Sequence, residues 1–166
     1  MKKRQKKYNP NKHKVDPNSA FMAISLSKPV SDTAKVELIT GIHLAIKAFA
    51  SGMANPANFD TLAQTVDLSM MLSQNIFERA YMNEILDARE AMFDCKERYM
   101  RTGKFGFSGT GFNAIKFVAE LHEEQLNHIT GAEVMKFLEK RKNHIRSGNY
   151  YKPSKRLMEG SNVYAG

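Results

Sequence analysis

The most regular hydrophobic pattern in the chain lies in YMNEILDAREAMFDCKERYMR, residues 81–101. Its apolar side chains recur at steps of three or four residues, at Tyr81, Ile85, Ala88, Met92, Cys95 and Tyr99. This spacing places them on one face of an α-helix. The outer face is expected to carry the charged side chains Glu84, Asp87, Arg89, Glu90, Asp94, Lys96, Glu97 and Arg98. The segment therefore predicts an amphipathic helix that packs one face against neighbouring helices.

Two further helices are predicted before this segment. Ser31 or Asp32 can cap the first by accepting backbone N–H groups, and this helix ends near Asn55. Its apolar positions are Leu38, Ile42, Ala45, Phe49 and Met53. Asn55 followed by Pro56 begins the second helix, because proline loses no hydrogen bond at the first helical position. A break is expected around residues 74–79. The buried side of the second helix is predicted from Leu62, Val66, Met70 and Phe77.

A glycine-rich stretch, RTGKFGFSGTG at residues 101–111, follows the central segment. Its four glycines are unfavourable in a helix, so a loop is predicted. The first glycine can end the preceding helix, and the last two allow a turn. Two interpretations remain open for its other residues. In one, the phenylalanines pack inward. In the other, Arg101 and Lys104 contact phosphate while an exposed Phe105 stacks on a base.

Two helices are predicted after the loop. Ser108 or Thr110 can cap the first of them, and its apolar positions are Ile115, Val118, Leu121, Leu126 and Ile129. Thr130 and Glu133 have the spacing of a capping box and begin the last helix, which ends near Gly148. Its apolar side is predicted from Val134, Phe137, Leu138 and Ile145.

These elements predict an all-α fold, a bundle of four to five mostly antiparallel helices. The bundle domain spans residues 31–148, between an extended basic arm at 1–30 and a basic tail at 149–166. Prolines interrupt the arm, and the apolar residues Phe21, Ile24 and Leu26 are candidates to pack its last part onto the core. A length of 166 residues fits one domain with a real core.

Composition places the protein in a reducing, aqueous compartment. The chain is 42% hydrophobic and 25% charged, and no apolar run approaches the roughly 20 residues needed to span a bilayer. The apolar run at residues 21–26 follows a basic segment, as in a signal peptide, but it is too short and Lys28-Pro29 interrupts it. Cys95 is the only cysteine, so an intrachain disulfide cannot form.

The net charge of +8 is concentrated towards the two ends of the chain. Residues 1–20 and 134–166 each carry +6, whereas residues 21–133 carry −4. Concentrated positive charge favours polyanionic partners, namely RNA, DNA, a ribonucleoprotein or an acidic protein face, although solvated tails give the same pattern. The candidate contact residues are Lys2, Lys3, Arg4, Lys6, Lys7, Lys12, Lys14, Arg101, Lys104, Phe105, Lys140, Arg141, Lys142 and Arg146.

No motif predicts catalysis, a metal or a cofactor. His122 and His128 are six residues apart, so their rings diverge by roughly 120° on a helix and cannot share a zinc ion. We expect these histidines at the surface or partly buried. Cys95 lies on an apolar stripe and is expected to be a packing residue. The glycine-rich stretch lacks the spacing of a phosphate-binding P-loop. We therefore expect a non-enzymatic protein with no metal and no cofactor.

Two segments resemble small helical proteins of tailed-phage and prophage genomes. They are the opening KKRQKKYNPNK, residues 2–12, and CKERYMRTGKFGFSGTG, residues 95–111. The resemblance implies a bacterial host cytoplasm and an accessory phage role, such as host takeover or counter-defence, but no established activity.

Three functions follow as hypotheses. The first is a protein that binds nucleic acid or a ribonucleoprotein through its basic arm and basic last helix. The second is a phage inhibitor that binds a host defence or regulatory protein, in the manner of an anti-CRISPR protein. The third is a structural or dimerising helical protein. A membrane is not expected as a partner.

Overall fold

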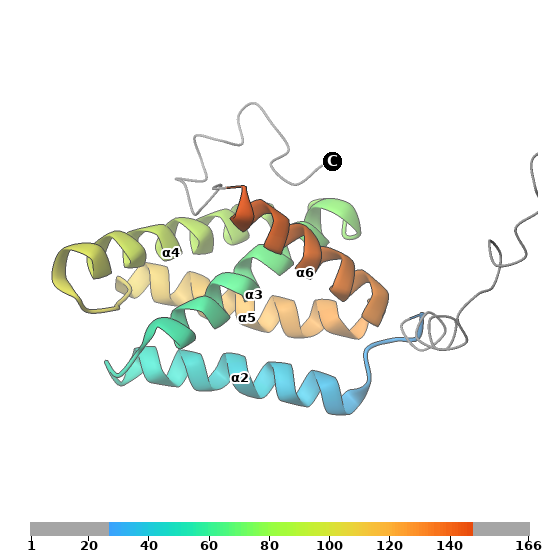
Figure 1. Cartoon of the computed structure of the whole chain (residues 1–166), viewed down its shortest axis with the longest axis horizontal. Helices are drawn as coiled ribbons and strands as arrows, with labels where there is room; N and C mark the ends of the chain where they lie inside the picture. Colours follow the sequence, from blue (N-terminus) through green and yellow to red (C-terminus); the bar gives the residue numbers. More distant parts are fainter. Residues whose placement is uncertain (1–26, 148–166) are drawn as a thin grey trace, which may run out of the picture.

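The computed structural model describes residues 27–147, which form the bundle of antiparallel helices that the sequence predicts (Figure 1). This part contains five helices and no strand beyond a single bridge. The helices are α2 (Asp32–Ala50), α3 (Pro56–Asn75), α4 (Met82–Thr102), α5 (Gly109–Asn127) and α6 (Gly131–Arg146). The predictions for residues 1–26 of the basic arm, including Phe21, Ile24 and Leu26, and for the tail at 149–166 concern residues outside the described part. None of the described helices is long and apolar enough to cross a membrane.

Capping residues fix where the helices begin, as predicted. Ser31 accepts a hydrogen bond from the backbone N–H of Ala34 at the start of α2, and Ser108 accepts one from Gly111 at the start of α5. Two complete capping boxes, Asn55 with Asn58 and Thr130 with Glu133, begin α3 and α6. In each box, the side chain of the first residue accepts a hydrogen bond from the backbone N–H of the second, and the side chain of the second accepts one from the backbone N–H of the first. Gly103 ends α4 in a left-handed conformation, with φ at 71°.

Helix α3 is the centre of the bundle, because it packs against each of the other four described helices. Eleven of its twenty residues are buried, including Leu62, Val66 and Met70. Such a helix must bury its polar positions as well, and Asp67, Ser69 and Ser73 are all buried. Hydrogen bonds or ion pairs are needed to offset the cost of removing these groups from water.

The predicted buried and exposed faces of α2 and α4 were wrong at some positions. Leu38 and Met53 were expected in the buried stripe of α2, but they are 40% and 75% exposed. Arg89 was expected on the outer face of α4, but it is 2% exposed. Because both α3 and α5 cover α4, its buried face is wider than the apolar stripe and includes this arginine. The guanidinium group of Arg89 lies 3.8 Å from the sulfur of Met70.

The break after α3 is confirmed and contains an unusual backbone. Glu78, Arg79 and Tyr81 all have positive φ angles, between 48° and 63°. Non-glycine residues rarely adopt this left-handed conformation. The hydroxyl of Ser73 donates a hydrogen bond to the carbonyl of Ala80, which ties the turn to the end of α3.

Gly109 and Gly111 were expected to form a turn, but both lie in the first turn of α5. The reason is packing in the case of Gly111. A Cβ at this position would lie 2.9 Å from the Cβ of Ala91, so the glycine lets α5 approach α4 closely. A Cβ at Gly109 would meet nothing within 4 Å.

We predict that Gly111→Ala destabilises the protein by about 1–3 kcal/mol, because the added methyl group overpacks the contact between α4 and α5. Gly109→Ala adds the same methyl group to the same helical turn in open space, and it is expected to leave stability unchanged or raise it by up to about 1 kcal/mol. Urea unfolding of the two variants measures the difference. Equal stabilities would show that close approach at Gly111 is unimportant.

The chain enters the bundle beside the connection between α5 and α6. Gly131 N–H donates to the carbonyl of Lys28 at 3.2 Å, and Val30 N–H donates to the carbonyl of Ile129 at 3.4 Å. Pro29 and Thr130 form the isolated bridge between these two segments. Residues 28–30, hereafter the arm root, are therefore fixed next to the first residue of α6.

Candidate polyanion-binding face of α6

Helix α6 lies on the outside of the bundle and packs mainly against α3. Its inner side contributes Phe137, its one buried residue, and the half-buried Val134 and Leu138. Arg141 also faces inward. Its Nε donates to a carboxylate oxygen of Asp67 on α3 at 2.9 Å, and both side chains are largely buried. The proposed phosphate contact of Arg141 is thus replaced by a structural ion pair.

Four other cations lie around the outer surface of α6. Lys136, Lys142 and Arg146 are exposed and Lys140 is half-buried. The helical period places Lys136 and Lys140 on one flank of the helix and Lys142 and Arg146 on the other. We call these four side chains the basic face. The ammonium groups of Lys136 and Lys140 lie 5.8 Å and 5.9 Å from the centre of the Phe137 ring. The ring is attracted to cations, so it helps to hold both lysine stems against the helix.

Acidic residues do little to neutralise the basic face. The helix carries two acids, Glu133 and Glu139, against five Lys or Arg. The carboxylate of Glu133 accepts hydrogen bonds from the N–H and hydroxyl of Thr130 in the capping box. Lys136 was not among the residues predicted from the sequence. The signal was present, since Lys136 and Lys140 are four residues apart and share one side of a helix.

The glycine-rich loop does not extend this face. Figure 1 shows the loop at the end of the bundle where α4 meets α5, whereas α6 begins at the opposite end. Phe105 stacks on Tyr99, with ring centres 3.9 Å apart, and on Phe59, with ring centres 5.3 Å apart. The ring also meets Phe49 edge to face. This packing supports the inward interpretation of the loop, because the faces of Phe105 already have aromatic partners.

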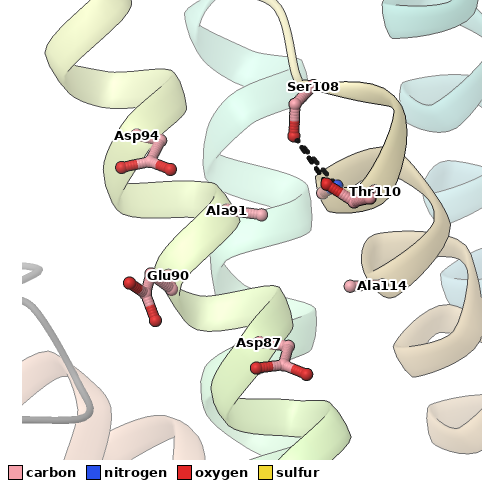
Figure 2. A pocket seen from close by; sticks show the side chains of 8 residues that line it. Asp87, Glu90, Ala91, Asp94, Ser108, Thr110 and Ala114 are labelled. Atoms are coloured by element: carbon pink, nitrogen blue, oxygen red, sulfur yellow. Dashed lines mark hydrogen bonds between the residues drawn. The ribbon is translucent and has the colours of Figure 1, made fainter.

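A hollow of about 350 Å³ beside the loop is acidic (Figure 2). Asp87, Glu90 and Asp94 project from successive turns of α4, opposite Ser108 and Thr110 at the start of α5. Three carboxylates repel phosphate, so this side of the bundle is unsuited to a polyanion. Arg101 and Lys104 are exposed, but they lie at the loop that borders this hollow.

The histidines do not come together. His122 is 3% exposed, so the expectation of a surface or partly buried side chain was wrong. His128 is exposed and its Nε2 lies 3.1 Å from a carboxylate oxygen of Glu124, which lowers the pKa of that carboxyl group. Within residues 27–147, no three His, Cys, Asp or Glu side chains are grouped so that they could hold a metal ion.

Cys95 is buried, as predicted for a packing residue. Burial raises the pKa of its thiol above the usual value, because the thiolate would lose its hydration. A thiol that resists ionisation is a poor nucleophile.

Comparison with protein-family models, with curated proteins and with solved structures found no match to this chain. The resemblance to small phage proteins therefore stays a prediction, and function has to be argued from the geometry above.

Proposed function

We propose that this is a non-enzymatic phage accessory protein that binds nucleic acid through the basic face and the two basic ends of the chain. The observation that carries the proposal is where these ends join the fold. The arm root is hydrogen-bonded to Gly131 at the start of α6, and α6 ends at Arg146, shortly before the basic tail in the sequence. The described residues that adjoin the two basic segments in the sequence therefore lie at opposite ends of one basic helix.

The distribution of charge supports this arrangement. Residues 27–147 contain fifteen Lys or Arg and fifteen Asp or Glu, so the described part of the chain is neutral overall. The net charge of +8 comes from residues 1–26 and 148–166. A neutral body with an acidic hollow on one side and basic residues along α6 would orient a polyanion towards α6.

The dimensions also fit a phosphate backbone. A helix of sixteen residues is about 24 Å long. Duplex DNA carries one phosphate per roughly 1.7 Å of its axis, so several phosphates would lie within reach of the four cations of the basic face. Lysine and arginine side chains whose charged ends contact phosphates, without contacts to bases, provide affinity with little sequence preference.

We predict that binding weakens steeply with salt and that the basic face contributes to the slope. Lys142→Ala combined with Arg146→Ala removes two exposed cations, so the slope of log affinity against log salt should decrease by about 2. Deleting residues 1–19, which hold seven Lys or Arg, should decrease the slope further. Fluorescence anisotropy with single-stranded RNA, single-stranded DNA and duplex DNA at several salt concentrations measures both effects.

A matched control is Lys47→Ala combined with Lys116→Ala, which removes the same charge from exposed positions on α2 and α5. This double variant should keep nearly the full slope. A salt-independent affinity, or equal losses in the two double variants, would contradict the proposed face. Weak binding of all three probes would instead favour a host protein as the partner, and a stoichiometric complex in nuclease-treated host lysate would then be the result to seek.

A further inference from the structure

A cavity of about 230 Å³ lies where α2, α3, α5 and α6 converge, on residues that the proposed function does not use. Six apolar side chains line it, Leu38, Ile42, Leu68, Leu126, Val134 and Leu138, together with the polar residues Glu37, Thr61, Gln64, Thr65 and His122. The space between helices of a bundle is a common place for small-molecule sites. Such sites combine apolar walls with a few polar groups that orient the ligand.

His122 is the most deeply buried polar residue of this wall. It is 3% exposed, its Nδ1 has no hydrogen-bond partner among the described residues, and its ring lies beside the side chain of Gln125. A buried polar atom without a partner is costly, so a ligand that hydrogen-bonds to the imidazole would be favoured. Burial also lowers the pKa of His122 to about 4, so the ring is neutral at pH 7 and has one donor and one acceptor nitrogen.

The sequence leaves room for the cavity at Gly41. This glycine lies within α2 and lines the cavity, and a Cβ added to it would meet nothing within 4 Å. Glycine in a helix interior is less favourable than alanine. Glycine at position 41 therefore lowers the stability of the helix and also leaves the adjacent space unfilled. A larger side chain at this position could occupy that space.

We infer that this cavity binds a small uncharged molecule with an apolar ring or branched body and one group that hydrogen-bonds to His122. The size follows from the volume, which equals that of about eight water molecules in the liquid. It is below the range of about 300–1,000 Å³ for drug-sized ligands. The lack of charge follows from the wall, whose only acidic or basic residues are Glu37, which is exposed, and the buried His122.

The test titrates the full-length protein with phenol, toluene and benzoate while methyl and amide NMR signals are recorded. Phenol and toluene have rings of equal size, but only phenol has a hydroxyl group, and benzoate adds a negative charge. Phenol should give saturable shifts at Leu126, Val134 and Leu138, and contacts from its ring to these side chains. Toluene should bind at least fivefold more weakly, and benzoate should not bind there.

Two substitutions at one position complete the test. Gly41→Leu fills the cavity and should abolish the shifts, whereas Gly41→Ala adds only one methyl group and should retain them. His122→Leu should remove the preference for phenol over toluene. The inference is overturned if phenol produces no saturable shifts at the cavity at millimolar concentration in the unmodified protein. It is also overturned if binding persists unchanged in a folded Gly41→Leu variant. These results are independent of nucleic-acid binding.

Discussion

Asp67→Ala is expected to destabilise the protein by about 3 kcal/mol or more. Asp67 lies on the central helix α3, and the exposed fraction of its side chain is 7%. It accepts a hydrogen bond from Arg141 of α6, whose side chain is 17% exposed. Removing the carboxylate leaves Arg141 as a largely buried charge without this partner, which costs more than the intact pair contributes. Because α6 packs mainly on α3, much of the loss should appear as loosening of α6.

Urea unfolding measures the total effect, and hydrogen exchange of the α6 amides locates it. Asp60→Ala removes an exposed carboxylate from the same helix and should change stability by less than about 0.5 kcal/mol. In a double-mutant cycle, Arg141→Ala should cost much less when Asp67 is already alanine. A loss below about 1 kcal/mol for Asp67→Ala would show that the ion pair does not hold α6.

The second large effect is a loss of stability in mild acid caused by His122. Its pKa is about 4 in the folded protein and about 6.5 in the unfolded chain. Between these values the unfolded state binds a proton that the folded state excludes, so stability falls as the pH falls from 7 towards 4. The loss should reach about 2 kcal/mol at pH 5 and about 3 kcal/mol near pH 4.

The pH dependence is measured by urea unfolding between pH 7.5 and 5, above the range in which most carboxylates titrate. His122→Gln should flatten the curve in this interval, whatever its effect on stability at neutral pH. His43→Gln changes an exposed histidine near Glu123 and should leave the curve unchanged. A wild-type curve that is already flat between pH 7.5 and 5 would refute the assignment.

The sequence predicted the order and starts of the helices, and their number as four to five, because these depend on local rules. Ser31, Asn55, Ser108 and Thr130 each cap a helix through contacts within three residues. The break after α3 was also predicted, although not its left-handed residues. Capping residues and the spacing of hydrophobic residues can be recognised in the sequence alone, so the positions of the helices could be predicted from them.

The buried polar residues were missed for a different reason. His122 lies four residues from both Val118 and Leu126, and Arg141 lies four residues after Phe137, so the period places both on inner faces. The prediction for these two residues followed residue type rather than position, because arginine is mostly exposed and histidine is only intermediate in its burial. Their burial depends on contacts such as that between Asp67 and Arg141, which are 74 residues apart. No local pattern reveals such a partner.

The candidate face was predicted in part. Lys140, Lys142 and Arg146 were identified from the sequence and are exposed or half-buried on α6, whereas Arg141 faces inward. The position of the arm root beside the start of α6 could not be foreseen. It depends on the hydrogen bonds between the arm root and the α5–α6 connection, about one hundred residues away in sequence.

Those hydrogen bonds also determine how a mechanical load would travel through the protein. Tension on the first residues of the chain reaches residues 28–30 before it reaches α2. Two backbone hydrogen bonds to Ile129 and Gly131 pass part of that tension to the connection from which α6 starts. A pull on the arm and a pull on the tail would thus be applied to opposite ends of α6 and borne along its axis, where the backbone hydrogen bonds of a helix run.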